Sequence, residues 1–366
     1  MMRSYDVVIV GAGLFGSTIA RLAADSGLRP LVLDRREHIG GNCWSYREGP
    51  IDVHAYGPHV IHTDDRGVWS YFERFATMFH VVTGPIANYQ GKLYNLPFNM
   101  NTFYALWGVT TPEEAKKEIE SQRVPCDEPR NLEEHVLNLV GRDVYEKLVK
   151  GYTEKQYGKP CSELPASLIS RMPLLFTFEN DYLRKRYQGV PEQGYEYLFQ
   201  NMLKGIDVEL GADYLEDSTR WRSLAPLLVY TGPIDEYFGY RFGELEYRGR
   251  KFEHVIYEEE NHQGVSFMNY TDADNPCLRS TEHKHFTRAE SANTVVTYEY
   301  AVPWHKGDVP YYSVNDAKNQ VRYKQYLELS KVDASVVFGG RLGEYRYYTM
   351  SDTVQSAFKL AGRLFG

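Results

Sequence analysis

The clearest evidence for the fold of this chain is the segment Asp6-Val7-Val8-Ile9-Val10-Gly11-Ala12-Gly13-Leu14-Phe15-Gly16. Residues 7–10 are all β-branched, which is typical of a strand buried in a parallel sheet. Residues 17–26 then have the apolar periodicity of a helix, and Gly27 is placed to end it. The G-x-G-x-x-G spacing therefore lies between a strand and a helix, the context that makes it a specific sign of dinucleotide binding.

The three glycines have separate roles in the predicted turn. Gly11 permits the tight turn, Gly13 lets the backbone approach a pyrophosphate, and Gly16 allows close helix–strand packing. A second strand, Leu31-Val32-Leu33-Asp34, completes a βαβ unit of about 30 residues, with Asp34 placed to accept hydrogen bonds from ribose hydroxyls. The sequence thus predicts an α/β fold with a Rossmann-like domain, and this unit alone leaves NAD and FAD as alternatives.

The segment that follows Asp34 favours FAD. Residues 34–42 contain a second pair of glycines, Gly40 and Gly41. In flavoproteins such a loop brings backbone against the cofactor, and a plain surface turn is the alternative.

Composition excludes several classes of protein. The chain has 366 residues and a net charge of −8, which argues against a nucleic-acid partner. No apolar run approaches the ~20 residues that span a bilayer, and the start leaves no room for a signal-peptide core. The four cysteines have no CxxC spacing, so neither a disulfide framework nor a metal–sulfur site is expected. We therefore expect a cytoplasmic protein with no membrane association.

Later segments predict two further domains. Helix starts such as Thr111-Pro112-Glu113-Glu114 predict a helical domain. Short β-rich segments, residues 245–247 and 252–257 among them, predict antiparallel strands. The expected division is a discontinuous FAD-binding domain of residues 1–76, 205–238 and 315–366, a helical domain of residues 101–180, and an antiparallel sheet domain of residues 77–100, 181–204 and 239–314.

Nine further segments carry a resemblance to a known family. They include His38-Ile39-Gly40-Gly41-Asn42, Tyr56-Gly57-Pro58-His59-Val60-Ile61-His62-Thr63 and Lys150-Gly151-Tyr152-Thr153-Glu154-Lys155-Gln156, and the others are residues 95–102, 187–191, 230–235, 282–286, 310–312 and 339–345. Taken in the order in which they occur along nearly the whole chain, these segments resemble those of the bacterial UDP-galactopyranose mutases. So many ordered matches are more specific than any single motif.

The resemblance implies a chemistry and a set of partners. It implies FAD, active in its reduced form, and a redox-neutral interconversion of UDP-galactopyranose and UDP-galactofuranose, a precursor of surface polysaccharides. The reduced flavin N5 is thought to attack the anomeric carbon and displace UDP, which is covalent catalysis by the cofactor. A nucleotide-sugar substrate, an external electron donor and a homodimer are implied as partners.

The resemblance also implies a mobile substrate loop in the helical domain of residues 101–180, and roles for single residues. The expected catalytic residues are Arg171, Arg279 and His59. The expected substrate-binding residues are Tyr152, Thr153, Tyr157, Arg171, Tyr182, Asn269, Arg279, Tyr312 and Tyr347. The expected cofactor-binding residues are Gly11, Gly13, Phe15, Gly16, Asp34, Arg35, Gly41, Asn42, His59, Arg341 and Met350. No metal is expected, because no cysteine or carboxylate spacing supports the histidine pairs at 59/62 and 283/285.

Two positions depart from the family pattern. Tyr157 stands where the family carries tryptophan beside the sugar, and Thr349 replaces an acidic or amide residue near the flavin. An altered sugar, such as N-acetylgalactosamine on UDP or a 6-deoxy sugar on dTDP, is one hypothesis, and neutral drift is the other. A flavin oxidoreductase of the amine-oxidase type and an inactive nucleotide-sugar binding protein remain alternatives, because both are compatible with the opening motif.

Overall fold

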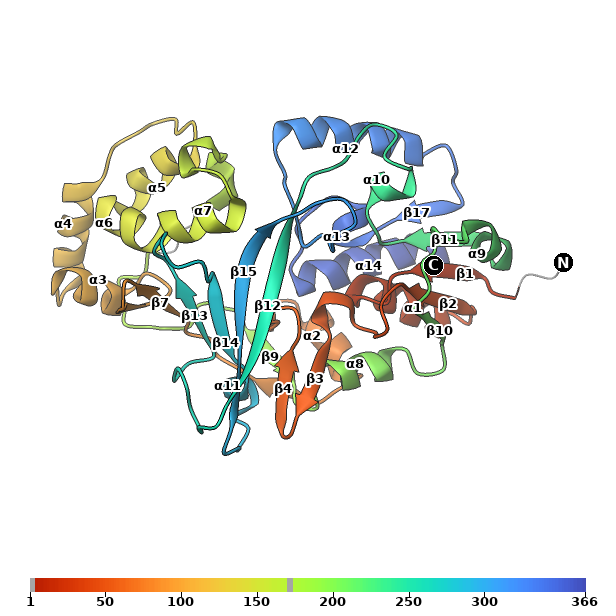
Figure 1. Ribbon diagram of the computed structural model, residues 1–366, viewed down its shortest axis with the longest axis horizontal. Helices are drawn as coiled ribbons and strands as arrows, with labels where there is room; N and C mark the ends of the chain where they lie inside the picture. The colour runs from red at the N-terminus through yellow and green to blue at the C-terminus, as the bar shows by residue number, and fades with distance from the viewer. Residues whose placement is uncertain (1–3, 170–173) are drawn as a thin grey trace.

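The predicted dinucleotide-binding unit forms part of a five-stranded parallel sheet in the computed structural model, which describes residues 4–169 and 174–366 (Figure 1). In spatial order the strands are β10 (Asp207–Leu210), β2 (Pro30–Asp34), β1 (Val7–Val10), β11 (Leu227–Tyr230) and β17 (Val336–Phe338). In the central strand β1, Ile9 lies level with Val32 on one side and Val229 on the other. Burial on both faces explains why β1 is an unbroken apolar run rather than an alternating one.

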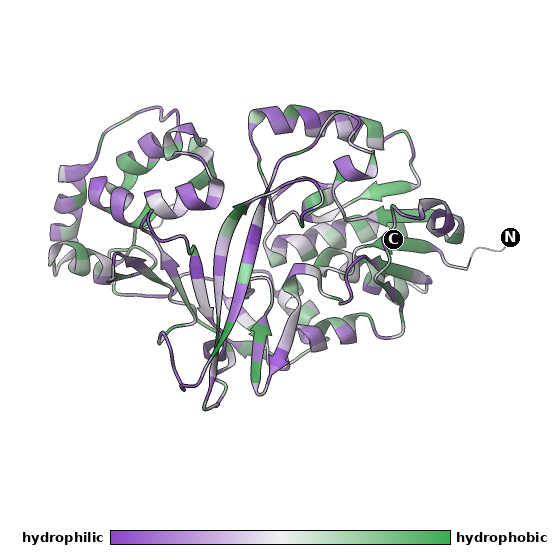
Figure 2. Ribbon diagram, viewed as in Figure 1, coloured by the Kyte–Doolittle hydropathy of each residue, from purple (hydrophilic) through white to green (hydrophobic). Residues whose placement is uncertain are grey.

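Helices cover both faces of this sheet. The surrounding helices are α1 (Leu14–Asp25), α8 (Tyr195–Met202), α9 (Ser218–Leu224), α10 (Ile234–Tyr237), α12 (Ala317–Ser330), α13 (Gly340–Gly343) and α14 (Met350–Phe365). On one face Ile19 of α1 packs with Ala357 and Leu360 of α14, and on the other Trp221 of α9 packs with Val8. The hydrophobic residues are concentrated in the strands between these layers (Figure 2).

A helical layer lies apart from the parallel sheet (Figure 1). It contains α3 (Met100–Trp107), α4 (Pro112–Gln122), α5 (Leu132–Val140), α6 (Arg142–Val144), a π-helical turn (Tyr145–Lys150), α7 (Gly151–Tyr157) and two short 3₁₀ turns (Cys161–Glu163 and Ala166–Ile169). The predicted start of α4 is a capping box, in which Thr111 and Glu114 bond each other's backbone N–H groups. Phe103, Val136 and Tyr145 belong to the buried core of this layer.

A seven-stranded sheet separates the helical layer from the parallel sheet (Figure 1). Its order is β16 (Tyr312–Ser313), β12 (Tyr247–Tyr257), β15 (Thr294–Pro303), β14 (Arg279–Glu282), β13 (Phe267–Tyr270), β7 (Ile86–Tyr89) and β8 (Lys92–Asn95). All neighbours are antiparallel except β13 and β7. The two separate strands expected at 245–247 and 252–257 are wrong, because β12 is one strand that pairs with β15 from Arg248 to Tyr257.

Two smaller sheets complete the fold. The first is the hairpin of β3 (Ser45–Glu48) and β4 (Ile51–His54), and the second is a three-stranded sheet of β5 (Ile61–Thr63), β9 (Tyr187–Pro191) and β6 (Met78–His80). Three further short helical segments are the 3₁₀ turn Gly41–Cys43, α2 (Arg66–Glu73) and α11 (Lys284–Thr287).

One expected grouping of segments differs from the structure. Residues 77–100 and 181–204 were both expected in the antiparallel sheet domain, but only β7 and β8 lie in the seven-stranded sheet. Strand β9 instead pairs with β5 on one side and with β6 on the other, and Leu198 and Phe199 of α8 pack with Leu14 of α1. The difference arises from long-range strand pairing and from the packing of an apolar helix face. Neither can be predicted from local composition. The domain boundaries themselves stay a prediction.

Within the described residues, no helix has the length and apolar character needed to cross a membrane.

Candidate active site

A cavity of about 510 Å³ lies where the carboxyl ends of β1, β2 and β11 face the seven-stranded sheet. Ligands of open parallel sheets bind at this edge. The predicted site residues that line the cavity are Gly11, Gly13, Phe15, Gly16, Asp34, Arg35, Gly41, Asn42, His59, Tyr152, Tyr182, Asn269, Arg279, Tyr312, Arg341, Tyr347 and Met350. Thr153 and Tyr157 do not line it, and Arg171 lies outside the described residues.

The glycine-rich turn forms one end of this cavity. Gly11 has a φ of +106°, which favours glycine, and a Cβ on Gly16 would collide with the carbonyl oxygen of Gly11. A Cβ on Gly41 would lie 2.9 Å from Cα of Gly13, so the two loops approach each other as bare backbone. At this end of the cavity the two loops therefore pack backbone against backbone, with no room for side chains at these glycines.

The N-terminus of α1 points into the same end. Gly13 occupies the N-cap position without a side-chain cap, and the first turn, Leu14 to Gly16, lines the cavity. The backbone N–H groups of such a turn have no partner within the helix and, with the helix dipole, favour an anion. This end of the cavity can therefore hold a pyrophosphate without a cationic side chain.

Asp34 lies at the end of β2, where the sequence predicted it. Its two carboxylate oxygens accept hydrogen bonds from the backbone N–H groups of Ala12 (2.7 Å) and Arg36 (2.9 Å). Each oxygen keeps a second lone pair for a ligand hydroxyl. These bonds fix the carboxylate between the glycine-rich turn and the loop that follows β2, at the wall of the cavity.

Arg36, which sequence reasoning passed over, is better placed in this cavity than Arg35. Arg35 is largely exposed and faces Glu236 at 3.4 Å. Arg36 donates from Nη2 to Asn42 at 2.9 Å, and its guanidinium lies over the ring of Tyr56. Its Nη1 is buried and has no hydrogen-bond partner among the described residues. A buried donor of this kind is costly unless a ligand or water satisfies it, and this orphan atom was not visible in the sequence.

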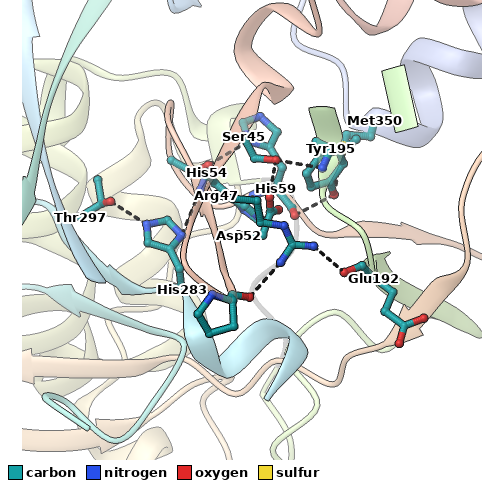
Figure 3. A network of polar contacts seen from close by, with 12 residues as sticks. Ser45, Arg47, Asp52, His54, His59, Glu192, Tyr195, His283, Thr297 and Met350 are labelled. Carbon is teal, nitrogen blue, oxygen red and sulfur yellow. Dashed lines mark hydrogen bonds and ion pairs between the residues drawn. The ribbon is translucent and has the colours of Figure 1, made fainter. Parts of the chain in front are cut away.

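A network of polar contacts positions His59, which lines the cavity (Figure 3). The backbone N–H of His59 donates to Nδ1 of His54 (3.1 Å), and its carbonyl accepts from the hydroxyl of Tyr195 (2.8 Å). Nε2 of His54 lies 3.5 Å from Asp52, which also accepts from the hydroxyl of Ser45 at 2.7 Å. The loop that carries His59 is thus held by groups from β3, β4 and α8.

The hydrogen bonds of His59 also fix its protonation. Nδ1 lies 2.9 Å from the carbonyl oxygen of Gly57, so Nδ1 carries the proton and Nε2 is the acceptor. Burial, reinforced by the neighbouring His54, lowers the pKa of His59 to about 3. His59 is therefore neutral near pH 7 and can accept a hydrogen bond but cannot act as a cationic acid.

The predicted histidine pair at 283/285 is part of the same buried structure. Nδ1 of His283 accepts from the backbone N–H of His54 (3.2 Å), and its Nε2 lies 2.6 Å from the hydroxyl of Thr297 (Figure 3). His285 faces Glu282 at 3.1 Å. In the part of the chain that the structure describes, no group of three potential metal ligands occurs.

Met350 and Arg341 lie close to this network. Met350 Sδ accepts a weak hydrogen bond from the hydroxyl of Tyr195 at 3.9 Å (Figure 3). The guanidinium of Arg341 lies over the rings of Tyr312 (5.2 Å) and Tyr347 (4.8 Å), which is the geometry of a cation–π contact. Arg341 therefore connects the wall near His59 to the tyrosines at the other end of the cavity.

Arg279 is fixed at that other end by side chains from three elements. Its Nη2 donates to the hydroxyl of Tyr152 on α7 (2.6 Å), and its Nε donates to Asn269 on β13 (3.0 Å). Burial lowers the pKa of Arg279, but the contacts with Tyr152 and Glu299 raise it more, so the pKa stays above its ordinary value. The guanidinium is a permanent cation that is held in place before any ligand arrives.

Tyrosines surround this cation. Tyr312 and Tyr347 lie with ring centroids 5.9 Å apart, and Tyr182 and Tyr347 are largely exposed. Burial, with the nearby Glu299 carboxylate, raises the pKa of Tyr312 to about 12, so its hydroxyl stays a hydrogen-bond donor near neutral pH. An anion beside Arg279 would therefore meet Tyr312 as a neutral O–H donor rather than as a phenolate.

Sequence reasoning missed Lys155, which joins two walls of the cavity. Its Nζ donates to the backbone carbonyls of Tyr270 (2.8 Å), Asn275 (2.8 Å) and Cys277 (3.0 Å). These bonds attach α7, which carries Tyr152, to the connection between β13 and β14. A lysine inside a helical motif gives no sign in the sequence that its partners are distant carbonyls.

Comparisons with known proteins match this architecture. The family model described as UDP-galactopyranose mutase matches residues 147–347, and that of NAD(P)-binding Rossmann-like domains matches residues 9–75. A crystal structure of a reduced UDP-galactopyranose mutase superposes with a TM-score of 0.73, at 12% sequence identity, over 99% of this chain and 96% of that one. The predicted Rossmann-like α/β fold is thereby confirmed.

Two curated relatives are similar over almost their whole length. A protein of Klebsiella pneumoniae named "Probable UDP-galactopyranose mutase" is 37% identical over 98% of this chain and 94% of its own length. A dTDP-fucopyranose mutase of Escherichia coli is 36% identical over 97% of both chains. The two relatives are thus about equally similar to this chain although their names give different sugars and different nucleotides.

Proposed function

This chain belongs to the UDP-galactopyranose mutase family, and on that premise we propose that it interconverts UDP-galactopyranose and UDP-galactofuranose with the help of FAD. Membership confirms the resemblance that the nine sequence segments predicted. The observation that carries the proposal is a single cavity that has a glycine-rich dinucleotide cradle at one end and Arg279 at the other. A cofactor and a nucleotide sugar can meet only in such a shared space.

We assign FAD to the cradle end because the residues present fit a dinucleotide. The uncapped first turn of α1 would hold the pyrophosphate, Asp34 a ribose, and the unpartnered Nη1 of Arg36 a further polar group. His59, Arg341 and Met350 also line the cavity. A bound and reduced flavin would supply the nucleophile for the anomeric carbon of the sugar.

The remaining chemistry is assigned to residues of this chain. Arg279 and the hydroxyl of Tyr312, which both line the cavity, are proposed to stabilise the diphosphate as its charge grows during departure from the sugar. Arg171 is proposed as the second diphosphate cation, on the strength of the resemblance alone. His59 is proposed to accept a hydrogen bond through its unprotonated Nε2, since its pKa of about 3 excludes a role as cationic acid.

We further propose the setting in which this reaction runs. The enzyme would be a cytoplasmic homodimer whose flavin is reduced by an external electron donor, and its product would enter surface polysaccharides. These proposals rest on the family resemblance. Light scattering of the purified holoprotein tests the dimer, and a mass of one chain would overturn it.

The proposed reaction is tested by incubating dithionite-reduced protein with UDP-galactose and following a furanose product by NMR. We expect turnover with reduced flavin, none with oxidised flavin, and no net consumption of a nicotinamide per product formed. Stoichiometric oxidation of a substrate would favour an amine-oxidase type of reaction instead. Binding of UDP-galactose without conversion would favour an inactive binding protein.

A second substrate is favoured by one observation. The E. coli relative named dTDP-fucopyranose mutase is 36% identical to this chain, against 37% for the Klebsiella relative. We therefore retain dTDP-fucopyranose and UDP-N-acetylgalactosamine as alternative substrates. The same NMR assay with each nucleotide sugar, compared by kcat/KM, decides among the three.

A further inference from the structure

Three charged side chains lie on one face of the seven-stranded sheet, on three neighbouring strands. Glu299 of β15 is directly opposite Arg279 of β14, and Arg250 of β12 is opposite Ala301, two residues along from Glu299. Because side chains alternate between faces with a period of two, Arg250, Glu299 and Arg279 point to the same side. Directly opposite and diagonal positions are close enough for charged side chains to meet.

The carboxylate of Glu299 lies at different distances from its two arginine neighbours. Its Oε1 accepts a hydrogen bond from Nε of Arg250 at 2.8 Å, while its Oε2 lies 3.9 Å from Nη1 of Arg279. Arg250 is 1% exposed at its side chain and Glu299 is 6% exposed. The pair formed by Arg250 and Glu299 is therefore a desolvated ion pair, in which each charge needs the other.

The hydrogen bonds that Arg279 donates go to residues other than Glu299. Its Nη2 and Nε bond Tyr152 and Asn269, and Arg279 lines the cavity, as does Glu299. Arg250 does not line the cavity; its guanidinium packs over the ring of Tyr312 at 4.8 Å, behind the wall. Glu299 is thus hydrogen-bonded to Arg250, whereas its contact with Arg279, the cation that faces a ligand, is longer at 3.9 Å.

We propose that Arg250 is a positioning residue that holds the Glu299 carboxylate away from Arg279 and so leaves the charge of Arg279 available to the diphosphate of the nucleotide sugar. Without Arg250, the buried carboxylate would lie beside a single cation and would pair with it, because a buried charge left alone is strongly unfavourable. Arg279 would then meet the diphosphate as part of a neutral pair. The inference rests on the proposed function, since it concerns how the same cavity recognises a diphosphate.

The test is isothermal titration calorimetry of the oxidised holoprotein with UDP and, separately, with uridine, which lacks the diphosphate. We expect Arg250→Met to raise the Kd of UDP at least about tenfold and to leave the Kd of uridine within about twofold, since the lost interaction is with phosphate charge. The double variant Arg250→Met/Glu299→Gln restores charge balance and should recover most of the loss. Two independent structural defects would instead add.

Lys251→Met is the matched control, because it removes one positive charge from the next residue of β12, whose side chain lies over Tyr300 on the other face. Its UDP affinity should equal that of wild type. If Arg250→Met binds UDP as wild type does, or if the double variant is no better than Arg250→Met, the inference is wrong while the proposed function stands. If wild-type protein does not bind UDP, the proposed function falls and the inference with it.

Discussion

The hydroxyl of Tyr152 lies 2.6 Å from Nη2 of Arg279. Tyr152 belongs to α7 in the helical layer and Arg279 to β14 of the seven-stranded sheet, so one hydrogen bond joins two layers at the wall of the cavity. The bond orients the guanidinium at the cavity wall. The position of the helical layer and the electrostatics of the site are therefore linked through this pair.

Replacement of the predicted diphosphate arginines should remove most activity. We expect Arg279→Ala to lower kcat/KM by roughly a hundredfold, or ~3 kcal/mol, because a charge-assisted contact strengthens as the diphosphate leaves. The same loss is predicted for Arg171→Ala, whose position lies outside the described residues. Arg220→Ala, at a cation that packs on Trp221 of α9, is the control. Near-normal turnover of either variant in the NMR assay would show that its residue is misassigned.

Loss of the Lys155 ammonium should weaken the attachment of α7 to the connection between β13 and β14. Lys155→Met keeps the length of the side chain but leaves three backbone carbonyls without their charged donor. We expect the free energy of unfolding to fall by about 2 kcal/mol and UDP to bind more weakly. Lys117→Met, at an exposed lysine on α4, should change neither quantity. Unchanged urea unfolding and unchanged UDP affinity together would contradict the role given to Lys155.

A methyl group at Gly16 should expel the cofactor. The Cβ of Gly16→Ala would collide with the carbonyl oxygen of Gly11, so the glycine-rich turn has to move away from its present path. We expect the variant to purify with little or none of the flavin absorbance of the wild-type protein. Gly362→Ala is the matched control, because nothing lies near its added Cβ on α14, and it should stabilise the helix by about 0.5–1 kcal/mol. A fully yellow Gly16→Ala protein would count against the cradle.

The lowered pKa of His59 predicts a loss of stability in mild acid. The pKa is about 3 in the folded state, below that of an exposed histidine, so between about pH 6.5 and 3 the unfolded chain binds a proton that the folded chain does not. Stability is thus complete above pH 6.5 and falls as the pH drops. From pH 7.5 to 5.5 the loss due to His59 is about 1.4 kcal/mol.

The variant His59→Asn should lack this part of the pH dependence in urea unfolding of the holoprotein. His305→Gln, at a histidine whose side chain is 80% exposed, should retain it. His283 has a pKa lowered by burial in the same direction and contributes a separate part of the slope. Equal slopes for wild type and His59→Asn would mean that His59 is protonated in the folded protein at pH 5.5.

Local patterns predicted the parts of the site that are continuous in the chain. The G-x-G-x-x-G turn, Asp34 and the Gly40-Gly41 loop lie at the cradle because a βαβ unit places its own turn at the edge of its own sheet. Thr349 shows how a departure from the family pattern can be read once the structure is present. It is the N-cap of α14, bonded to the backbone N–H of Asp352 at 3.1 Å, a position that acidic and amide residues fill equally well.

Side chains that are brought together by pairing between distant strands could not be predicted from the sequence. Arg250, Glu299 and Arg279 meet because β12, β15 and β14 pair in one register, and a shift of one residue would turn any of them to the other face. The unpartnered Nη1 of Arg36 and the three hydrogen bonds of the Lys155 ammonium likewise depend on chain segments that are distant in the sequence. The residues next to them in the sequence contain no information on such contacts. The family resemblance, in contrast, identified Arg279 and His59 as candidate site residues.

Tyr157 is the last position at which resemblance and structure can be set against each other. The resemblance predicts a place beside the sugar, but the ring packs against the core of the helical layer and does not line the cavity. Burial raises the pKa of its hydroxyl, and the side chain lies close to Tyr152 and Tyr347, which do line the cavity. A larger ring at position 157 would therefore act by moving these two tyrosines. We expect Tyr157→Trp to change the ratio of kcat/KM values for UDP-galactose, UDP-N-acetylgalactosamine and dTDP-fucose by roughly tenfold, since a change of a few side-chain atoms in a packed pocket has about this effect. Tyr157→Phe, which removes the hydroxyl and keeps the ring, should change it less. If UDP-galactose is the best substrate of both the wild type and Tyr157→Trp, with unchanged ratios, Tyr157 does not determine which sugar the enzyme accepts.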